Sequence, residues 1–247
     1  MRLYFLTLGV FYTIDTGEIG DVMKLVVDID EVLNTTRAVR QRLDFGRKVE
    51  KAVIEECLLM AQQASVGSNK EDWRFVVVTE LDVKRSIAAL YRQVWDETVA
   101  GPLGSGEAAT VARLSPSMRE TDEDKKRQMK ILEGVEYLVR NLESVPAILF
   151  ACSQAPTPRH PMGGGASGYY GSIFPFVWSF QLALRSRGLG SVLATAIAHK
   201  AAEVAKILNL PSGCNVIAMV PFAYTQGINF TRGARGPLKS IVRWEKW

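Results

Sequence analysis

Histidine and cysteine are scarce in this chain of 247 residues. Its two histidines, His160 and His199, stand far apart, which disfavours hydrolases that use a Ser-His-Asp or Cys-His arrangement. The three cysteines show neither a C-x-x-C pair nor the spacing of metal ligands. We therefore expect reduced, buried thiols in a cytoplasmic protein, and no metal site.

Long apolar runs are also absent, because no stretch reaches the ~18 residues that a membrane helix needs. The first 14 residues are apolar but lack the small-residue cleavage site of a signal peptide. The sequence that begins at Met23 is more typical of the N-terminus of a globular domain. The sequence thus predicts an N-terminal extension or arm over residues 1–22, a single domain over residues 23–247, and no membrane partner.

Acidic residues are missing from residues 144–202. Residues 144–247 contain ten Lys and Arg residues against Glu203 and Glu245, a net charge of +8, whereas the first 143 residues have a net charge of −4. This asymmetry favours a small anionic ligand or an anionic partner. Basic residues interleaved with exposed aromatics are not found, so we expect no nucleic-acid partner.

The spacing of apolar residues predicts an α+β domain in which helices surround a small sheet. Asp82 is the predicted N-cap of one helix and Thr121 starts another, while Pro and Gly separate the remaining elements. We predict a mobile loop or lid over residues 100–118 and a second loop over residues 154–168. The other predicted elements are helices over 48–64, 172–187 and 200–209, and strands over 73–79, 147–152, 214–222 and, in the tail, 239–243.

Three glycines, Gly163, Gly165 and Gly168, satisfy the G-x-G-x-x-G pattern of dinucleotide-binding folds. The pattern requires a strand directly before it and an acidic residue ~20 positions later, and neither is present. We interpret these glycines as part of a flexible loop.

A cluster of basic residues spans Arg37 to Lys51. A guanidinium offers a two-pronged donor that matches phosphate, although a solvated helix face is the alternative interpretation. Arg37 and Arg40 are three positions apart, so in a helical turn they would point the same way.

Three further polar clusters follow along the chain, and a helix-terminating turn remains the alternative for the first of them. They comprise Ser65, Gly67, Ser68 and Asn69; then Gly188, Gly190, Ser191 and Thr195; and finally Arg232, Gly233, Arg235 and Gly236.

Taken together, these clusters resemble the nitroreductase family, whose members use FMN to pass electrons from NAD(P)H to nitro compounds, quinones and related acceptors. The resemblance implies a three-layer fold, with a mostly antiparallel or mixed central sheet flanked by helices. It also implies an intertwined homodimer with FMN at the subunit interface, in which helix 172–187 lies at the interface. The matching segments are TTRAVR (35–40), ASVGSNKEDWRFVVV (64–78), FVWSFQLALRSRGLGSVLAT (176–195) and RGARGPL (232–238).

The resemblance also implies which residues bind the cofactor. The first basic segment and the tail would hold the FMN phosphate, Asn69 the ribityl chain or ring edge, and the segment after Gly190 the ring. Ala38 and Thr36 stand where many relatives have Ser and Arg, and Glu71 replaces a frequent Gln. The implied cofactor-binding residues are Arg37, Ala38, Val39, Arg40, Ser65, Asn69, Leu193, Ala194, Thr195, Arg232 and Arg235.

No catalytic side chain is expected, because a flavin itself performs hydride and electron transfer. The sequence therefore predicts an FMN-dependent oxidoreductase with a ping-pong cycle, in which NADPH or NADH reduces FMN and a small-molecule electron acceptor then enters. The alternative is a flavoenzyme of the same fold with another reaction, of the dehalogenase, flavin-fragmenting or dehydrogenase type.

Overall fold

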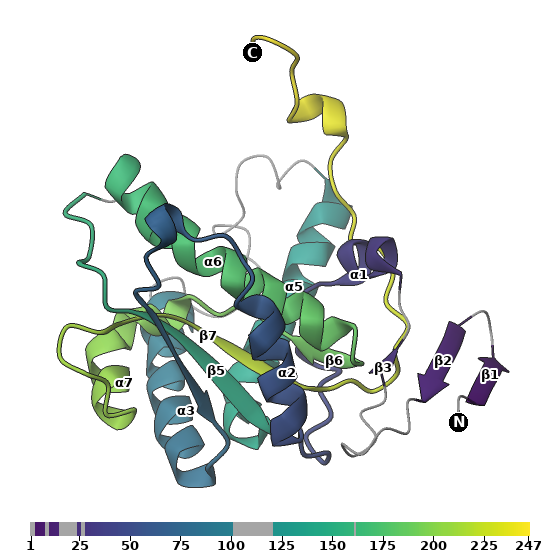
Figure 1. Ribbon diagram of the computed structural model, residues 1–247, viewed down its shortest axis with the longest axis horizontal. Helices are drawn as coiled ribbons and strands as arrows, with labels where there is room; N and C mark the ends of the chain where they lie inside the picture. The colour runs from purple at the N-terminus through teal and green to yellow at the C-terminus, as the bar shows by residue number, and fades with distance from the viewer. Residues whose placement is uncertain (1–2, 8–9, 15–23, 26–27, 101–120, 161) are drawn as a thin grey trace.

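The computed structural model describes residues 3–7, 10–14, 24–25, 28–100, 121–160 and 162–247. The strands among these residues form two antiparallel sheets (Figure 1). The smaller sheet contains β1 (Leu3–Thr7), β2 (Val10–Ile14) and β3 (Lys24–Leu25). Its first two strands fall in the predicted N-terminal arm, whose boundary stays a prediction. Nearly all of the predicted lid lies outside the described residues.

The larger sheet has the strand order β4-β5-β7-β6, with every neighbouring pair antiparallel. Its strands are β4 (Trp73–Val78), β5 (Ala147–Ser153), β7 (Asn215–Tyr224) and β6 (Leu189–Ser191). Every residue of β5 is buried, which explains its continuous apolar sequence: both faces of this central strand are covered.

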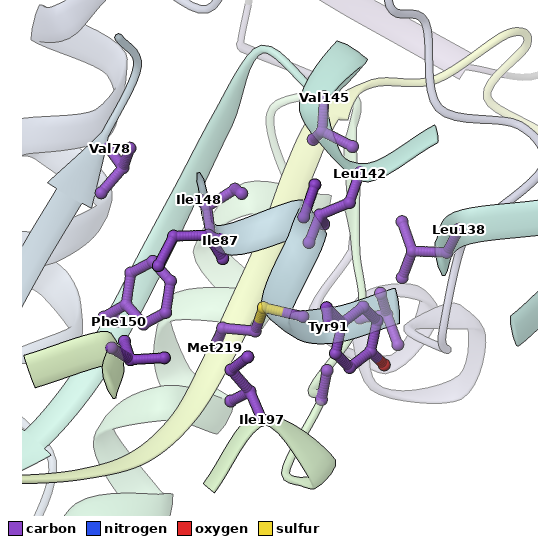
Figure 2. Packing of buried hydrophobic residues seen from close by; sticks show 14 of the residues in the cluster. Val78, Ile87, Tyr91, Leu138, Leu142, Val145, Ile148, Phe150, Ile197 and Met219 are labelled. Carbon is purple, nitrogen blue, oxygen red and sulfur yellow. The ribbon is translucent and has the colours of Figure 1, made fainter. Parts of the chain in front are cut away.

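One face of the sheet packs against α3 (Leu81–Trp95), α5 (Asp122–Asn141) and α7 (Ala201–Ile207). Figure 2 shows this layer, where side chains of β5 and β7 meet those of α3 and the end of α5. The contacting residues include Ile148 and Phe150 of β5, Met219 of β7, Ile87 and Tyr91 of α3, and Leu138 of α5.

The opposite face packs against α2 (Lys51–Ala61) and α6 (Gly164–Arg185), which cross in front of β5 and β7 in Figure 1. Leu149 of β5 and Phe222 of β7 point to this side, and Phe222 meets Phe180 of α6 edge to face. Because alternate residues of one strand serve two cores, the molecule has three layers. The predicted α+β, three-layer fold is confirmed.

The predicted helices are present, with two corrections to their ends. Thr121 caps α5 as predicted, and its hydroxyl accepts a hydrogen bond from the Asp124 N–H at 3.1 Å. By contrast, α3 begins after Glu80, so Asp82 lies in its first turn and is not the N-cap. The helix predicted from residue 172 begins at Gly164, which leaves a shorter loop than 154–168.

The prediction of a strand over residues 239–243 is wrong. The tail instead contains a 3₁₀ turn, η6 (Leu238–Ser240), with no strand partner among the described residues. The fourth strand of the sheet is β6, which follows α6 after Gly188, whose φ of +73° requires the freedom of glycine. Pairing with β7 and a bridge between Ser191 and Ala38 define this three-residue strand, so its own sequence does not predict it.

The remaining elements are short. They are α1 (Ile29–Thr35), the 3₁₀ turns η1 (Gly67–Asn69), η4 (Leu142–Ser144) and η5 (Ala196–Lys200), and the π-helical turn η2 (Asp96–Ala100).

Gly190 in β6 occupies a position without room for a side chain. A Cβ placed there would lie 2.6 Å from Thr225 Cγ2 and 2.9 Å from Val39 Cβ and Cγ1. The absence of a side chain thus lets the segment that contains Val39 approach the sheet.

The variant Gly190→Ala is expected to reduce the free energy of unfolding by about 1–3 kcal/mol, because the methyl group overpacks this contact. Urea unfolding measures the change. The matched control is Gly171→Ala in α6, where a Cβ meets nothing within 4 Å and helix propensity favours alanine by up to about 1 kcal/mol. Equal stability of the two variants would contradict the tight packing at Gly190.

Candidate functional site

Residues 38–44 run along the edge of the larger sheet and carry the first basic cluster. The Val39 N–H donates to the Ser191 carbonyl at 2.9 Å, and the Asp44 N–H donates to the Tyr224 carbonyl at 2.8 Å. Val39 is buried, Ala38 is exposed and Arg40 is half-buried, and the chain turns at residues 40–42. Arg37 and Arg40 do not lie in one helical turn, because α1 ends at Thr35.

The two arginines nevertheless line one cavity of about 490 Å³. Its walls are residues 37–42, part of α5, and tail residues 229–231 and 233–235. Its lining, as far as the structure describes it, contains basic side chains and no Asp or Glu. The basic residues are Arg37, Arg40, Arg42, Arg127, Lys130 and Arg235.

Carboxylates compensate one of the arginines of this cavity, since Arg127 forms ion pairs with Glu123 and Asp124 at 3.4 and 3.1 Å. Burial lowers the pKa of the half-buried Arg40 guanidinium, and no carboxylate forms an ion pair with it in the described chain. Arg37 Nη1 donates to the Thr231 carbonyl at 3.2 Å, and Arg235 Nη1 donates only to the adjacent Ala234 carbonyl. A phosphate would supply the missing negative charge and match the guanidinium geometry.

The sequence interpretation missed the contribution of α5. Gly134 lies beneath Arg40, where a Cβ would be 3.7 Å from Arg40 Cδ. Phe45 and Tyr137 stack with their ring centroids 6.1 Å apart, which joins α5 to the chain just after the basic segment. The one signal in the sequence was Gly134 itself, the single glycine of α5, since an isolated helical glycine often marks a close approach.

The third predicted group, Leu193, Ala194 and Thr195, follows β6 directly. The N–H of Ala194 donates to the Met219 carbonyl at 2.9 Å, which fixes this segment beside the sheet while the Leu193 and Thr195 side chains are exposed. The segment is two residues beyond Ser191, the partner of Val39, but does not line the cavity. Arg232 is exposed and does not line it either, unlike Arg235.

The predicted residues Ser65 and Asn69 lie at a different place. Ser65 precedes η1 and Asn69 is its last residue; the Gly67 N–H of this turn donates to the Ser172 hydroxyl of α6 at 3.1 Å. Ser68 and Asn69 have φ values of +55° and +53°, an uncommon conformation for residues other than glycine. A second cavity, of about 300 Å³, lies beside them and is lined by η1, the first turns of α6 and Trp73.

The two groups of predicted site residues lie beside different parts of α6 (Figure 1). Ser172, in the first half of the helix, contacts Gly67, and Arg185 at the end of the helix donates to Thr35 Oγ1 at 3.2 Å. At 1.5 Å per residue, these two helix positions are about 20 Å apart. One chain thus brings Arg37, Arg40 and Arg235 together, and holds Ser65 and Asn69 away from them.

An apolar groove of about 470 Å³ lies between α2 and α6. Phe75 and Phe176 stack at its base with their ring centroids 3.8 Å apart, and Leu59, which is 65% exposed, forms part of its wall.

Other chemistry is not supported by the described part of the chain. Its three cysteines are free and buried as predicted, and burial raises the pKa of the Cys57 and Cys152 thiols to about 12, which makes them poor nucleophiles. Among the same residues, no group of His, Cys, Asp and Glu could hold a metal ion. No described helix has both the length and the apolar character to cross a membrane.

Comparison with known proteins assigns this arrangement to a family. The family model described as Nitroreductase family matches residues 34–224, which is most of the chain. No curated protein matches the sequence.

Solved structures share the fold at low sequence identity. Iodotyrosine deiodinase bound to FMN and 3-iodo-L-tyrosine is 19% identical to this chain. The match covers 89% of this chain and 100% of the deiodinase chain, with a TM-score of 0.63. The FMN and NADPH-dependent nitroreductase NfnB from Sphigopyxis sp. strain HMH is also 19% identical, with 90% and 100% coverage and a TM-score of 0.62. A BluB-like flavoprotein from Clostridium difficile 630 is 14% identical, with 89% and 100% coverage and a TM-score of 0.60.

The acid-free cavity is expected to bind inorganic phosphate. At a phosphate concentration ten times the dissociation constant, binding stabilises the protein by about 1.4 kcal/mol, seen as a higher melting temperature than in chloride of equal ionic strength. Arg40→Gln should abolish this difference. Arg47→Gln is the matched control, because Arg47 stacks on Tyr224 outside the cavity. If both variants keep the response to phosphate, the anion binds elsewhere.

Proposed function

The chain belongs to the nitroreductase family, and we propose on this basis that it is an FMN-dependent oxidoreductase. In this proposal NADPH or NADH reduces the flavin and leaves, and a quinone, a nitroaromatic compound or a related small molecule then takes the electrons in a ping-pong cycle. The observation that carries the proposal is the basic, acid-free cavity between residues 37–42, α5 and the tail.

The residues present fit FMN at its phosphate end. Arg37, Arg40 and Arg235 offer guanidinium donors on one cavity, and its volume is within the ~300–1,000 Å³ range of small-molecule sites. Two departures from the family pattern are accommodated. Ala38 contributes no hydroxyl, and the Thr36 hydroxyl donates to the Val32 carbonyl at 2.6 Å, so that it closes α1 instead of facing a ligand.

The flavin supplies hydride and electron transfer when bound, so the chain itself has to bind and orient it. The arginines would hold the phosphate, while the rigid backbone at Ala194, hydrogen-bonded in both directions with Met219, would support the ring. Ile131 and Gly134 are the uncharged residues of the cavity wall that α5 forms, beside Arg127 and Lys130.

We further propose that the protein acts as a homodimer in which each site uses both chains. Ser65 and Asn69 lie about 20 Å along α6 from the basic cavity, so they would complete the site of the partner. The apolar groove beside Leu59 and the exposed Trp178, 44% accessible, provide a surface suited to burial in a dimer. The tail after Arg235 leaves the body of the molecule (Figure 1) and would reach around the partner.

The main experiment is the visible spectrum of the purified protein followed by steady-state kinetics. Flavin absorbance and oxidation of NADPH or NADH with a quinone or nitroaromatic acceptor, with parallel double-reciprocal plots, are expected. A colourless protein that gains no flavin absorbance after incubation with FMN rejects the proposal. Bound FMN without oxidation of either nicotinamide by either acceptor would favour a dehalogenase, flavin-fragmenting or dehydrogenase reaction.

Sharing of sites between chains is tested by complementation. Arg40→Gln and Asn69→Ala homodimers are each expected to bind FMN weakly, because every site lacks one contribution. A purified heterodimer of the two variants, isolated with two different tags, has one intact site and should regain about half of the wild-type high-affinity FMN binding. A heterodimer as weak as both parents would show that each site is made by one chain.

A further inference from the structure

Arg42 lines the basic cavity, but its donors are already used by the protein. Its Nε and Nη2 donate to the Gln226 carbonyl at 3.1 and 2.9 Å, Nη2 also donates to Gly227, and Nη1 donates to Asn229, both at 2.9 Å. A guanidinium has five N–H groups, so little capacity remains for a ligand. Arg42 therefore differs from Arg37, Arg40 and Arg235, whose guanidiniums remain available.

Arg185 completes the same set of contacts from the end of α6. This buried side chain donates through Nη2 to the Ile228 carbonyl at 3.2 Å. Together the two guanidiniums pair with the carbonyls of four consecutive residues, 226–229. Both also stack on the Phe230 ring, with Arg42 Cζ 4.1 Å and Arg185 Cζ 5.0 Å from its centroid.

These contacts replace secondary structure where the tail begins. Residues 226–231 follow β7 and belong to no helix or strand, so their carbonyls have no backbone partners of the regular kind. The segment ends at Thr231, whose carbonyl accepts a hydrogen bond from Arg37, and the chain then continues to Arg235 in the cavity wall. The direction in which the chain leaves residue 230 thus determines where the Arg235 guanidinium lies.

We propose that Arg42, assisted by Arg185, is a positioning residue for the phosphate end of the cavity and acts through tail segment 226–231 on Arg235. This inference rests on the proposed function, since the phosphate is that of FMN. Lysine at position 42 would keep the charge but could not span the Gln226 and Asn229 carbonyls, because it lacks the rigid fork of a guanidinium. The tail would then lose its fixed direction while the electrostatic potential of the cavity remained.

The test compares binding of FMN and of riboflavin, which has the same ring and ribityl chain but no phosphate. Arg42→Lys is expected to weaken FMN binding by about tenfold, the equivalent of one charge-assisted hydrogen bond, and to change riboflavin binding by less than about twofold. Arg47→Lys is the matched control: it removes a guanidinium that stacks on Tyr224 and contacts no tail carbonyl, so FMN binding should not change. Melting temperatures of the flavin-free proteins check that both variants are folded.

A double-mutant cycle identifies the route of the effect. If Arg42 acts through Arg235, Arg42→Lys should have no further effect on FMN binding in an Arg235→Gln background. Additive losses, or an equal loss of riboflavin binding, would overturn the inference. Arg185→Lys, which alters the same segment from a residue outside the cavity, gives the same comparison if Arg42→Lys does not fold.

The outcome also separates this inference from the proposed function. If the wild type binds FMN no better than riboflavin, the phosphate site is misplaced and both are wrong. If the wild type prefers FMN and Arg235→Gln removes that preference, but Arg42→Lys and Arg185→Lys keep it, only the positioning role is wrong.

Discussion

Backbone pairing between residues 38–44 and the sheet determines where Arg40 and Arg42 lie in the cavity wall. Three hydrogen bonds, from Val39 to Ser191, Asp44 to Tyr224 and Gln226 to Arg42, fix this segment along β6 and the end of β7. Val39 is buried over Gly190, and the bend that follows it brings Arg40 beside Gly134 of α5.

This pairing also explains why so much positive charge can gather in one cavity. Repulsion among the guanidiniums is opposed by carbonyl oxygens, which carry partial negative charge and lie along the first part of the tail. Carboxylates would have neutralised the arginines more strongly, but they would also have competed with an anionic ligand. Arg127 is paired with Glu123 and Asp124, whereas pairing with carbonyl groups orders Arg37 and Arg42 without neutralising them.

The layered fold could be predicted from sequence where local patterns sufficed. Residues 147–152 form a strand because both faces of β5 are covered, and Thr121 starts α5 through an ordinary cap. The failures share one cause, since each depends on distant residues. The glycine-rich start of α6 has weak helix propensity and is helical where it packs beside η1. Strand β6 is defined by its backbone pairing with the distant β7. The tail has strand-forming residues but no strand to pair with within the described chain.

The candidate site was predictable in its chemistry and less so in its geometry. Basic residues near 37–40 and 235 predicted a shared anion site, and both segments line the same cavity. The sequence could not reveal that Arg42 serves the backbone, or that α5 forms a wall, because neither fact leaves a local periodicity. The separation of Ser65 and Asn69 from the arginines follows from the length of α6, which spans the molecule between them.

The contact between Arg37 and Thr231 joins residues 194 positions apart, and it has a consequence for biosynthesis. During translation the N-terminal arginines leave the ribosome long before their partners at residues 226–235 exist. Until then, the carbonyl acceptors that order these cations are missing, and the edge formed by residues 38–44 lacks both β6 and β7. The cavity therefore forms only after residues 226–235 have left the ribosome, so a chain that has not been synthesised beyond Arg235 cannot hold a ligand there.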